Sequence, residues 1–422
     1  MCLREAPLLS FLMGFHFFAS YLAISLSFPM MAFEVEDRNI APAMVGVIMS
    51  TVYIPTLILG FCLNRIAHHQ GRRCVYLSGL YLFSAITFIF GFLEFIPAKG
   101  PFISISIFLR LLIGLGTFFA KTILPPIMSK RFPKNMVFMF TYQYLFMSLA
   151  LGFGPALGEL LYRPLRDMFW PHLLIVVIIS AIFLPSGHWM LDYKKRDEEV
   201  KIVATVPSSN DPNDPGPPLR RQRIRRLLTN FEETFPFCKL FRHKRALSLS
   251  LMLFINIACQ VFYSSSLAEE LKEKDKSSFY IAIAYIIRPL CAAIFSSLVL
   301  PVAHKFGGIL CIFFGSLFHL ISFIFIGPSH FFMMPNNPDL IILGLAFKGV
   351  ADPFIYIPII PEIVAALLRK YRPTYTIGPI SDVAVSFANF LIDLASVLAT
   401  ILGYLTYKQV GFRITSDVML FA

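Results

Sequence analysis

Long apolar runs separated by short polar segments make up most of the chain. A run of about 20 apolar residues crosses the hydrocarbon core of a bilayer as a helix. The pattern predicts eleven complete spans, at 8–31, 42–64, 74–97, 101–128, 137–162, 169–192, 246–268, 278–303, 307–327, 338–368 and 376–405. The first is long enough to be a retained span rather than a cleaved signal. We therefore expect an all-α polytopic membrane protein without a separate soluble domain.

The basic residues are distributed unevenly between the polar segments. The chain carries 37 Lys and Arg against 25 Asp and Glu, a net charge of +12. Most of the basic residues fall at the N-terminus or in loops after even-numbered spans, which is the positive-inside pattern. We expect a cytosolic N-terminus and central loop, in a vesicular, endomembrane or plasma membrane. This placement accounts for the charge, and we expect no nucleic-acid partner.

Residues 194–245 form the one long polar interruption. They contain a Ser-, Asn-, Asp- and Pro-rich stretch at 207–218 and a basic run at 220–226. Two interpretations remain open: a solvated linker that obeys topology, or a short helix against anionic lipid headgroups. The predicted division is an N-terminal transmembrane half at 1–193, a cytosolic basic linker at 194–245 and a C-terminal transmembrane half at 246–422.

The two halves share sequence features at a nearly constant offset. Ala67-His-His-Gln-Gly71 parallels Ala303-His-Lys-Phe-Gly307, Gly114 parallels Gly349, and Gly158 parallels Gly403. The offsets are 236, 235 and 245 residues. Two copies of one helical unit, with a site between them at the midplane, are common among transporters. The second copy lacks a full last span, since residues 411–422 are too short to cross a membrane.

An arginine and two glycines mark the fourth span. Arg110 lies in the apolar stretch Phe108–Gly116, together with Gly114 and Gly116. An arginine at the centre of a span costs about 2.5–3.5 kcal/mol on insertion scales, so it faces a wet cavity or a partner. Glycines let neighbouring helices approach closely. We expect Arg110 to gate the path or to orient a solute.

The fifth span carries the sequence Gly154-Pro155-Ala-Leu-Gly158. Together with Arg110, Gly114 and Gly116, it resembles the R-x-x-x-G-x-G and G-P-x-x-G signatures of the major facilitator superfamily. The resemblance implies two pseudo-symmetric six-helix bundles, here with the last helix truncated, and a secondary transporter.

The second and third spans are joined by a loop similar to the superfamily pattern G-x-L-x-D-R-x-G-R-R, through Gly60, Asn64, Arg65, Gly71, Arg72 and Arg73. An ungapped match instead places His68 at the acidic position, and either way the Asp is lost. Arg72 and Arg73 serve either gating or topology.

The last predicted span carries a polar stripe. At 100° per residue, one narrow face holds Asp382, Ser386, Asn389, Asp393, Ser396 and Thr400. Such a stripe is too costly to face lipid, so it faces the bundle interior. It is either a pore lining with titratable carboxylates or interhelical hydrogen bonding.

Other charges lie inside predicted spans. Lys348 and Asp352 are spaced i,i+4 and form either a self-contained pair or a site where Asp352 exchanges a proton. Arg288 lies deep in its span, like Arg110, and is either functional or structurally paired. Lys121 and Glu362 lie near predicted inner helix ends, where snorkelling explains them. We expect His16 and His319 to be satisfied interior residues.

A narrower resemblance concerns the vesicular amine transporters. Gly349-Val-Ala-Asp352 and Ser381-Asp382-Val-Ala384 look like the tenth and eleventh helices of that branch. Leu63–Ile66 and Phe254–Asn256 also resemble segments of the same family. The resemblance implies that the two aspartates serve proton coupling and substrate binding. In that family the first helix carries an amine-binding aspartate and the seventh a glutamate, and these positions fall near Ser20 and Tyr263 here. A cationic amine would lose its counter-charge, so the family's substrate does not carry over. Polyamine-transporting relatives fit better than monoamine carriers.

These features lead to two functional hypotheses. The first is a monomeric transporter that exchanges a proton for a small organic solute by alternating access, since burial favours the neutral form of a carboxylate. The second is a non-transporting scaffold or complex subunit with the same fold. No catalytic motif, cofactor motif or metal-ligand spacing is present in the sequence, so we expect no enzyme, no cofactor and no metal site.

Overall fold

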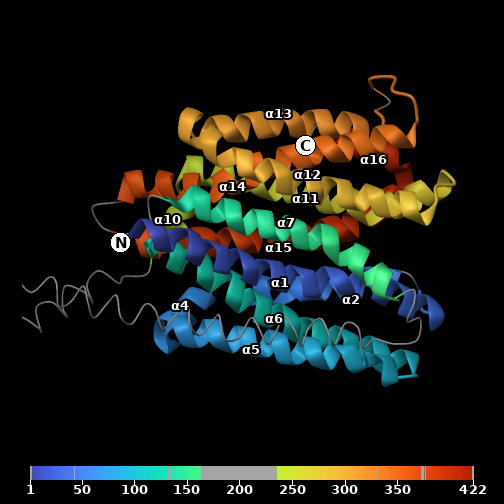
Figure 1. Cartoon of the computed structure of the whole chain (residues 1–422), viewed down its shortest axis with the longest axis horizontal. Coiled ribbons are helices and arrows are strands. Elements are labelled where there is room, and N and C mark those ends of the chain that lie inside the picture. Colours follow the sequence, from blue (N-terminus) through green and yellow to red (C-terminus); the bar gives the residue numbers. More distant parts are fainter. Residues whose placement is uncertain are drawn as a thin grey trace, which may run out of the picture.

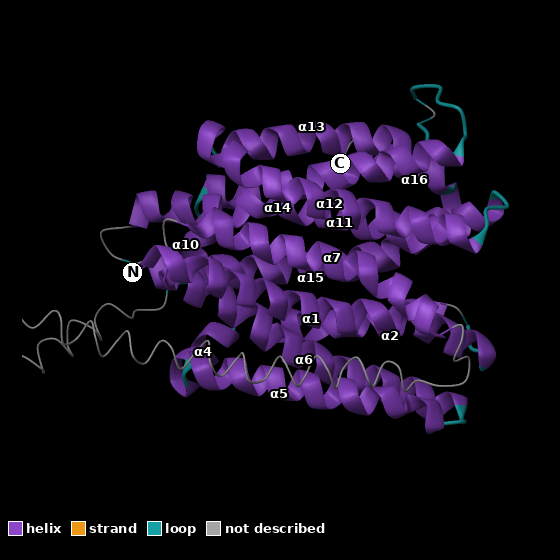
Figure 2. Ribbon diagram, in the orientation of Figure 1, coloured by secondary structure: helices purple, strands orange, loops and turns teal. Residues whose placement is uncertain are grey.

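The computed structural model describes residues 2–41, 43–131, 135–162, 235–329, 331–371, 375 and 377–420. In these residues every regular element is a helix (Figure 2). The reason is physical: lipid offers no hydrogen bonds, so each apolar run must satisfy its backbone internally as a helix.

The described residues before 163 form seven α-helices and two short 3₁₀ segments. The long helices are α1 (Cys2–Asp37), α5 (Arg72–Phe90), α6 (Lys99–Arg131) and α7 (Met136–Tyr162). The span expected at 42–64 is not one helix, because it divides into α2 (Ala43–Ser50), η1 (Thr51–Tyr53) and α3 (Ile54–Leu59). Pro55 lies in the first turn of α3, where its missing N–H costs least. The short helix α4 (Leu63–Gln70) precedes α5, and η2 (Gly91–Phe95) follows it.

The described residues from 235 onward form a second set of helices. Their bounds are α10 (Phe237–Phe241), α11 (Lys244–Glu273), α12 (Ser278–Phe306), α13 (Gly308–Ile326), α14 (Pro338–Tyr371), α15 (Ile377–Val410) and α16 (Phe412–Leu420). The nine-residue α16 packs against α13 and α11. The end of the predicted linker is therefore helical, while most of it lies outside the described residues.

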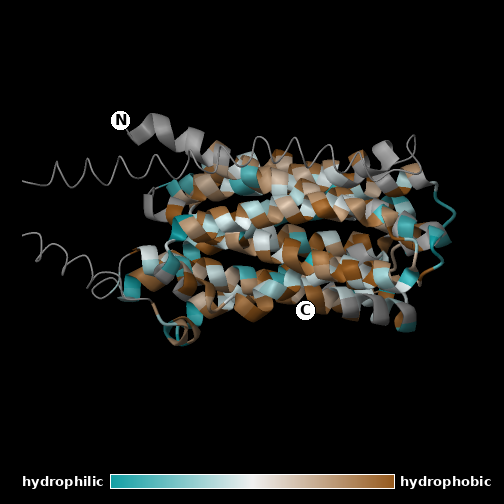
Figure 3. Ribbon diagram, turned by 90° about the horizontal axis from the view of Figure 1, so that it is seen from below, coloured by the Kyte–Doolittle hydropathy of each residue, from teal (hydrophilic) through white to brown (hydrophobic). Residues whose placement is uncertain are grey.

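Eight helices in the described part of the chain are long and apolar enough to cross a membrane. Two shorter apolar segments, Met13–Ser27 and Met44–Leu59, lie in α1 and in the divided second span. Apolar residues prevail along the middle of the bundle and hydrophilic ones gather toward its ends (Figure 3). The protein is an integral multi-pass membrane protein, and the span predicted at 169–192 lies outside the described residues.

The helices pack into two neighbouring groups. Before residue 163, α1 packs on α7 and α5 packs on α6; after residue 235, α11 packs on α15, and α12 and α13 pack on α14. The groups meet where α15 lies against α6 and where α7 lies against α12 and α14 (Figure 1). Residues far apart in sequence therefore face one another along α15.

The same backbone contacts recur in both groups. A Cβ added to Gly114 of α6 would strike the carbonyl of Val52, and a Cβ added to Gly349 of α14 would strike the carbonyl of Arg288. The matching positions are 235 and 236 residues apart. Gly71 and Gly307, the matched loop glycines, adopt φ values of +86° and +87°, a conformation that favours glycine. These pairs match the offset of the sequence repeat.

Candidate functional site

Asp382 lies on the second turn of α15 and forms an ion pair with Arg72, the first residue of α5. The side chain of Asp382 is 14% exposed and that of Arg72 is 30% exposed. The loop motif and the polar stripe, which the sequence presented as separate features, therefore meet in one contact. Gly71, directly before Arg72, turns the chain between α4 and α5.

Asp393 lies 11 residues further along α15, about 16 Å deeper in the bundle. It accepts a hydrogen bond of 2.5 Å from Lys121 on α6, and Asp393 is only 1% exposed. The expectation that Lys121 snorkels to a helix end was wrong. Lys121 points across the bundle because a carboxylate of the facing helix neutralises it there.

The rest of the polar stripe follows the same interface. The side-chain amide of Asn389 donates to the hydroxyl of Thr122 on α6 at 3.2 Å. Ser386 is fully buried, and Ser396 donates to a carbonyl of its own helix. The stripe thus faces the α5–α6 side of the bundle, with a charged pair at Asp382, an amide contact at Asn389 and a second charged pair at Asp393.

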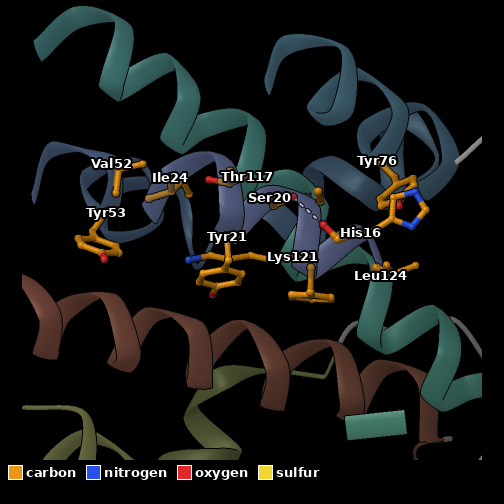
Figure 4. A pocket seen from close by; sticks show the side chains of 12 residues that line it. His16, Ser20, Tyr21, Ile24, Val52, Tyr53, Tyr76, Thr117, Lys121 and Leu124 are labelled. Carbon is orange, nitrogen blue, oxygen red and sulfur yellow. Dashed lines mark hydrogen bonds between the residues drawn. The ribbon is translucent and has the colours of Figure 1, made fainter. Parts of the chain in front are cut away.

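A small pocket with about 30 Å³ of free space lies beside Lys121, between α1, η1, α5 and α6. His16, Ser20 and Tyr21 come from α1, and Tyr53 comes from η1. Figure 4 shows Tyr21 and Tyr53 pointing toward the neighbouring helix that crosses the open side. Both tyrosines lie within electrostatic range of Asp393. The lining is mainly apolar and aromatic with few polar groups, as is usual for small-molecule sites.

Arg110 lies 11 residues before Lys121 on α6, about three helical turns away, and is 1% exposed. It donates a hydrogen bond of 2.6 Å to the hydroxyl of Ser27 on α1, and its guanidinium carbon lies 4.5 Å from the centre of the Phe90 ring. Its Nε has no hydrogen-bond partner in the described residues. A gap in the packing that is too narrow for a water molecule adjoins Arg110, and Ile24 lines both this gap and the pocket beside Lys121.

A second charged cluster lies among α11, α12, α13 and α14. Asp352 pairs with Lys348 one turn before it and accepts a hydrogen bond of 2.7 Å from Arg288. Lys348 is fully buried, and its Nζ lies 2.8 Å from the amide oxygen of Asn256 and 3.1 Å from Nδ1 of His319. The Lys348–Asp352 contact that the i,i+4 spacing allows is present, and Arg288 pairs with the same carboxylate. Two basic side chains share one carboxylate here.

The packing glycines lie where helices come closest. Gly116 of α6 faces the backbone of Phe83 on α5, and Gly154 of α7 faces Ser25 on α1. The side chains of Pro155 and of two loop-motif residues, Asn64 and Arg65, lie outside the described part, as does the surrounding of Gly158. Arg73 is exposed at the start of α5, beside Arg72.

Comparison with known proteins now decides the family. A sequence profile described as Major Facilitator Superfamily matches residues 13–400. The chain belongs to the major facilitator superfamily. Among curated proteins, it is 22% identical over 404 residues to the mouse MFS-type transporter SLC18B1, with 93% of this chain and 78% of the relative covered. It is 19% identical over 399 residues to the human protein of the same name, with 93% and 79% covered.

A solved structure shows the same fold. The proton:xylose symporter XylE, bound to 6-bromo-6-deoxy-D-glucose, superimposes with a TM-score of 0.66 at 15% identity, with 99% of this chain and 94% of XylE covered. The superfamily fold expected from Gly114, Gly116 and Gly154 is therefore confirmed, as is the resemblance to a solute-carrier branch. The relatives are transporters, so the chain belongs with transporters rather than enzymes.

The end of this superfamily bundle that holds Arg72 also holds an aromatic cluster. Phe237 of α10 lies 5.0 Å, between ring centres, from Phe61, which follows α3; Phe61 in turn lies 4.6 Å from Phe390 of α15. On the same α10, Phe241 lies 5.1 Å from Phe387 of α15. The short helix α10 therefore contacts both helix groups beside the Arg72–Asp382 pair.

Sequence reasoning missed several members of the site. Lys121 and Glu362 were both placed at helix ends, but Glu362 pairs with Arg245 of α11 at 3.0 Å. The contact between Lys348 and His319 was not anticipated either, since it joins two helices with no shared motif. The sequence did offer a signal for Lys121. It is a cation in the same span as Pro125, and the last predicted span carries an inward polar stripe with two aspartates that could pair with it.

Proposed function

We propose that the chain is a secondary active transporter that exchanges protons for a small organic solute by alternating access. The observation that carries the proposal is the pair of ion pairs along α15, Arg72–Asp382 at one end of the bundle and Lys121–Asp393 in its interior. Each joins a carboxylate in the helices after residue 235, the later group, to a cation in the helices before residue 163, the earlier group.

Such pairs couple protonation to movement of the two groups. A proton on Asp393 removes its attraction for Lys121, and the contact that holds α15 against α6 weakens. Lys121 pairs with Asp393, and the nearby Tyr21, Tyr53 and Tyr356 interact with it electrostatically. A proton shifts the equilibrium between two conformations only if the two states bind it differently, and an ion pair present in one state alone supplies that difference.

The solute occupies the pocket between α1 and α6, which lies directly beside Lys121. Release of Lys121 from Asp393 changes the charge that lines the pocket, so proton binding and solute binding act on one side chain. The cluster of Arg288, Lys348 and Asp352 lies inside the later group and provides a second titratable position. The predicted halves at 1–193 and 246–422, joined by 194–245, move as the two bodies of the monomer.

The positive-inside pattern orients this transporter with its N-terminus, α10 and the central loop in the cytosol. The Arg72–Asp382 pair and the aromatic cluster then lie at the cytosolic end. The structure has the cytosolic contacts formed, so we assign it to a state closed on that side. A vesicular, endomembrane or plasma membrane location each agrees with this orientation.

Uptake into proteoliposomes with an acidic interior tests the proposal. Wild-type protein, Asp382→Asn and the control Asp339→Asn are offered a panel of amines, polyamines and organic anions; Asp339 lies at the start of α14, outside the charged clusters. We expect uptake that collapses with a protonophore and with Asp382→Asn but not with Asp339→Asn. Folded protein that moves nothing in the panel favours the scaffold hypothesis instead.

A further inference from the structure

The cluster around Lys348 holds two cations and one carboxylate. The side chain of Lys348 on α14 is fully buried, and that of Asp352 is 1% exposed. Asp352 pairs with Lys348 and with Arg288 of α12, and no other Asp or Glu of the described residues pairs with either cation. Charges inside a membrane-spanning bundle are costly unless they are matched. With both cations charged, the cluster therefore carries one unmatched positive charge.

Only one of the two cations can remove this excess charge. Arginine stays charged in proteins, whereas a lysine ammonium can release a proton and become a neutral amine. Release from Lys348 leaves the Arg288–Asp352 pair, which is matched. A proton bound by Asp352 instead leaves two cations without a carboxylate, which is the least favourable of these arrangements. The charge balance therefore favours proton exchange at the nitrogen of Lys348 over proton exchange at the carboxylate.

The contacts of Lys348 suit both of its charge states. As an ammonium, Nζ has three hydrogens to donate, and it meets three acceptors: a carboxylate oxygen of Asp352, Oδ1 of Asn256 at 2.8 Å and Nδ1 of His319 at 3.1 Å. As a neutral amine, Nζ has a lone pair, and His319 donates to it when its ring proton is on Nδ1. The two hydrogens that remain still meet Asn256 and Asp352.

The other titratable groups near the cluster lie on the helices that pack around α14. On α11, Cys259 and Tyr263 interact with the cluster electrostatically, and on α7 Tyr144 does so. Arg288 and His319 come from α12 and α13. Because α7 belongs to the earlier helix group and packs on α12 and α14, movement between the two groups changes the surroundings of the cluster. A change in surroundings between two conformations is what allows them to bind a proton unequally.

We infer that Lys348 is a proton-binding site that exchanges its proton within the physiological pH range, while Asp352 remains a fixed counter-charge. The inference rests on the proposed transport function, of which Lys348 becomes the second titratable position. It differs from what the resemblance to the vesicular amine transporters implies, since that resemblance gives proton coupling to the aspartates.

A direct test observes the charge of the lysine itself. The purified full chain is labelled with carbon-13 at lysine Cε for NMR, and the Lys348 resonance is the one that Lys348→Met lacks. We expect this resonance to move from the ammonium to the amine position across the physiological pH range, while those of exposed lysines stay at the ammonium position, as ordinary lysines do. A Lys348 resonance that keeps one position at every pH overturns the inference.

Proteoliposomes with a trapped pH dye show whether this proton belongs to transport. They carry wild-type protein, Lys348→Met, Lys348→Arg or the control Lys305→Met, at an exposed lysine, and receive a labelled solute that the wild type transports. We expect both Lys348 variants to exchange labelled for unlabelled solute without solute-dependent proton movement, since neither new side chain can bind and release a proton. The control moves protons like the wild type.

Wild-type proton movement in either Lys348 variant overturns the inference and leaves the transport proposal standing, because a permanent charge or a neutral side chain then suffices. Lys348→Met retains the Arg288–Asp352 pair, so it decides if the larger side chain of Lys348→Arg prevents folding. A Lys348 resonance that titrates, in a protein that moves no solute, supports the proton-binding site and contradicts the transport proposal.

Discussion

Lys121 on α6 donates a hydrogen bond of 2.5 Å to Asp393 on α15, across 272 positions of sequence. Asp393 is 1% exposed and the side chain of Lys121 is 15% exposed. This contact joins the two helix groups deep inside the bundle and lies on the wall of the pocket. A change in the charge of either residue therefore acts on packing and on the pocket together.

Removal of one member of this pair is costly. We expect Lys121→Met to lower the free energy of unfolding by about 3–5 kcal/mol, because it leaves the Asp393 carboxylate buried and unpaired. Addition of Asp393→Asn recovers much of the loss, since no charge then remains. Denaturant unfolding of the purified protein measures both. Lys305→Met, at an exposed lysine, is the control, and a Lys121→Met protein as stable as this control contradicts the account.

The cluster around Asp352 responds unequally to changes of its members. Asp352→Asn leaves two basic side chains, Arg288 and Lys348, without a carboxylate, whereas Lys348→Met leaves the Arg288–Asp352 pair matched. We expect Asp352→Asn to be the more destabilising variant and the double variant with Lys348→Met to be more stable than Asp352→Asn alone. Melting curves of the three proteins provide the test, and an equal loss in both single variants goes against it.

The close contact of Gly114 with the Val52 carbonyl predicts a strong size limit. Gly114→Ala inserts a methyl group against backbone that cannot rotate away, with an expected cost of about 1–3 kcal/mol. Gly100 lies on the same helix with open space around it, so Gly100→Ala is the matched control and should be neutral or slightly stabilising. A Gly114→Ala protein that unfolds at the control's temperature would falsify the contact.

Two phenylalanines of α10 should differ in their effect on conformation. Phe237→Ala removes a contact with Phe61 of the earlier helix group, while Phe241→Ala removes a contact with Phe387 of α15 in the later group. An aromatic pair contributes about 0.5–1.5 kcal/mol beyond its buried area. We expect only Phe237→Ala to open the end of the bundle that holds α10, measured as faster backbone hydrogen exchange in α4 (Leu63–Gln70). Equal exchange in the two variants rules out α10 as a link between the groups.

Most of the long apolar helices in the described residues could be predicted from sequence, because a bilayer requires an apolar run of a given length wherever a helix crosses. The inward face of α15 followed for a similar reason, since Asp382 and Asp393 are too costly in lipid. The partners could not be predicted. Arg72 and Lys121 lie 310 and 272 positions from their carboxylates, and only the packing of α15 on α4 and α6 brings them together.

The depth of single residues was also hard to derive. Lys121 was assigned to a helix end because α6 was expected to stop at residue 128, yet the helix continues to Arg131. The second span was expected as one helix because its composition is uniformly apolar, and the 3₁₀ segment at Thr51–Tyr53 has no strong sequence mark. That segment matters, because it turns Tyr53 toward the pocket.

The most direct test of the central claim follows protons and solute in the same vesicles. Proteoliposomes with a trapped pH dye carry wild-type protein, Asp382→Asn, Asp393→Asn or the control Asp339→Asn, and are given a labelled solute that the wild type transports. We predict solute-dependent proton movement in the wild type and the control. In the two α15 variants it is lost, while exchange of labelled for unlabelled solute continues. Unaltered proton movement in both Asp382→Asn and Asp393→Asn would contradict the proposal that α15 carries the proton.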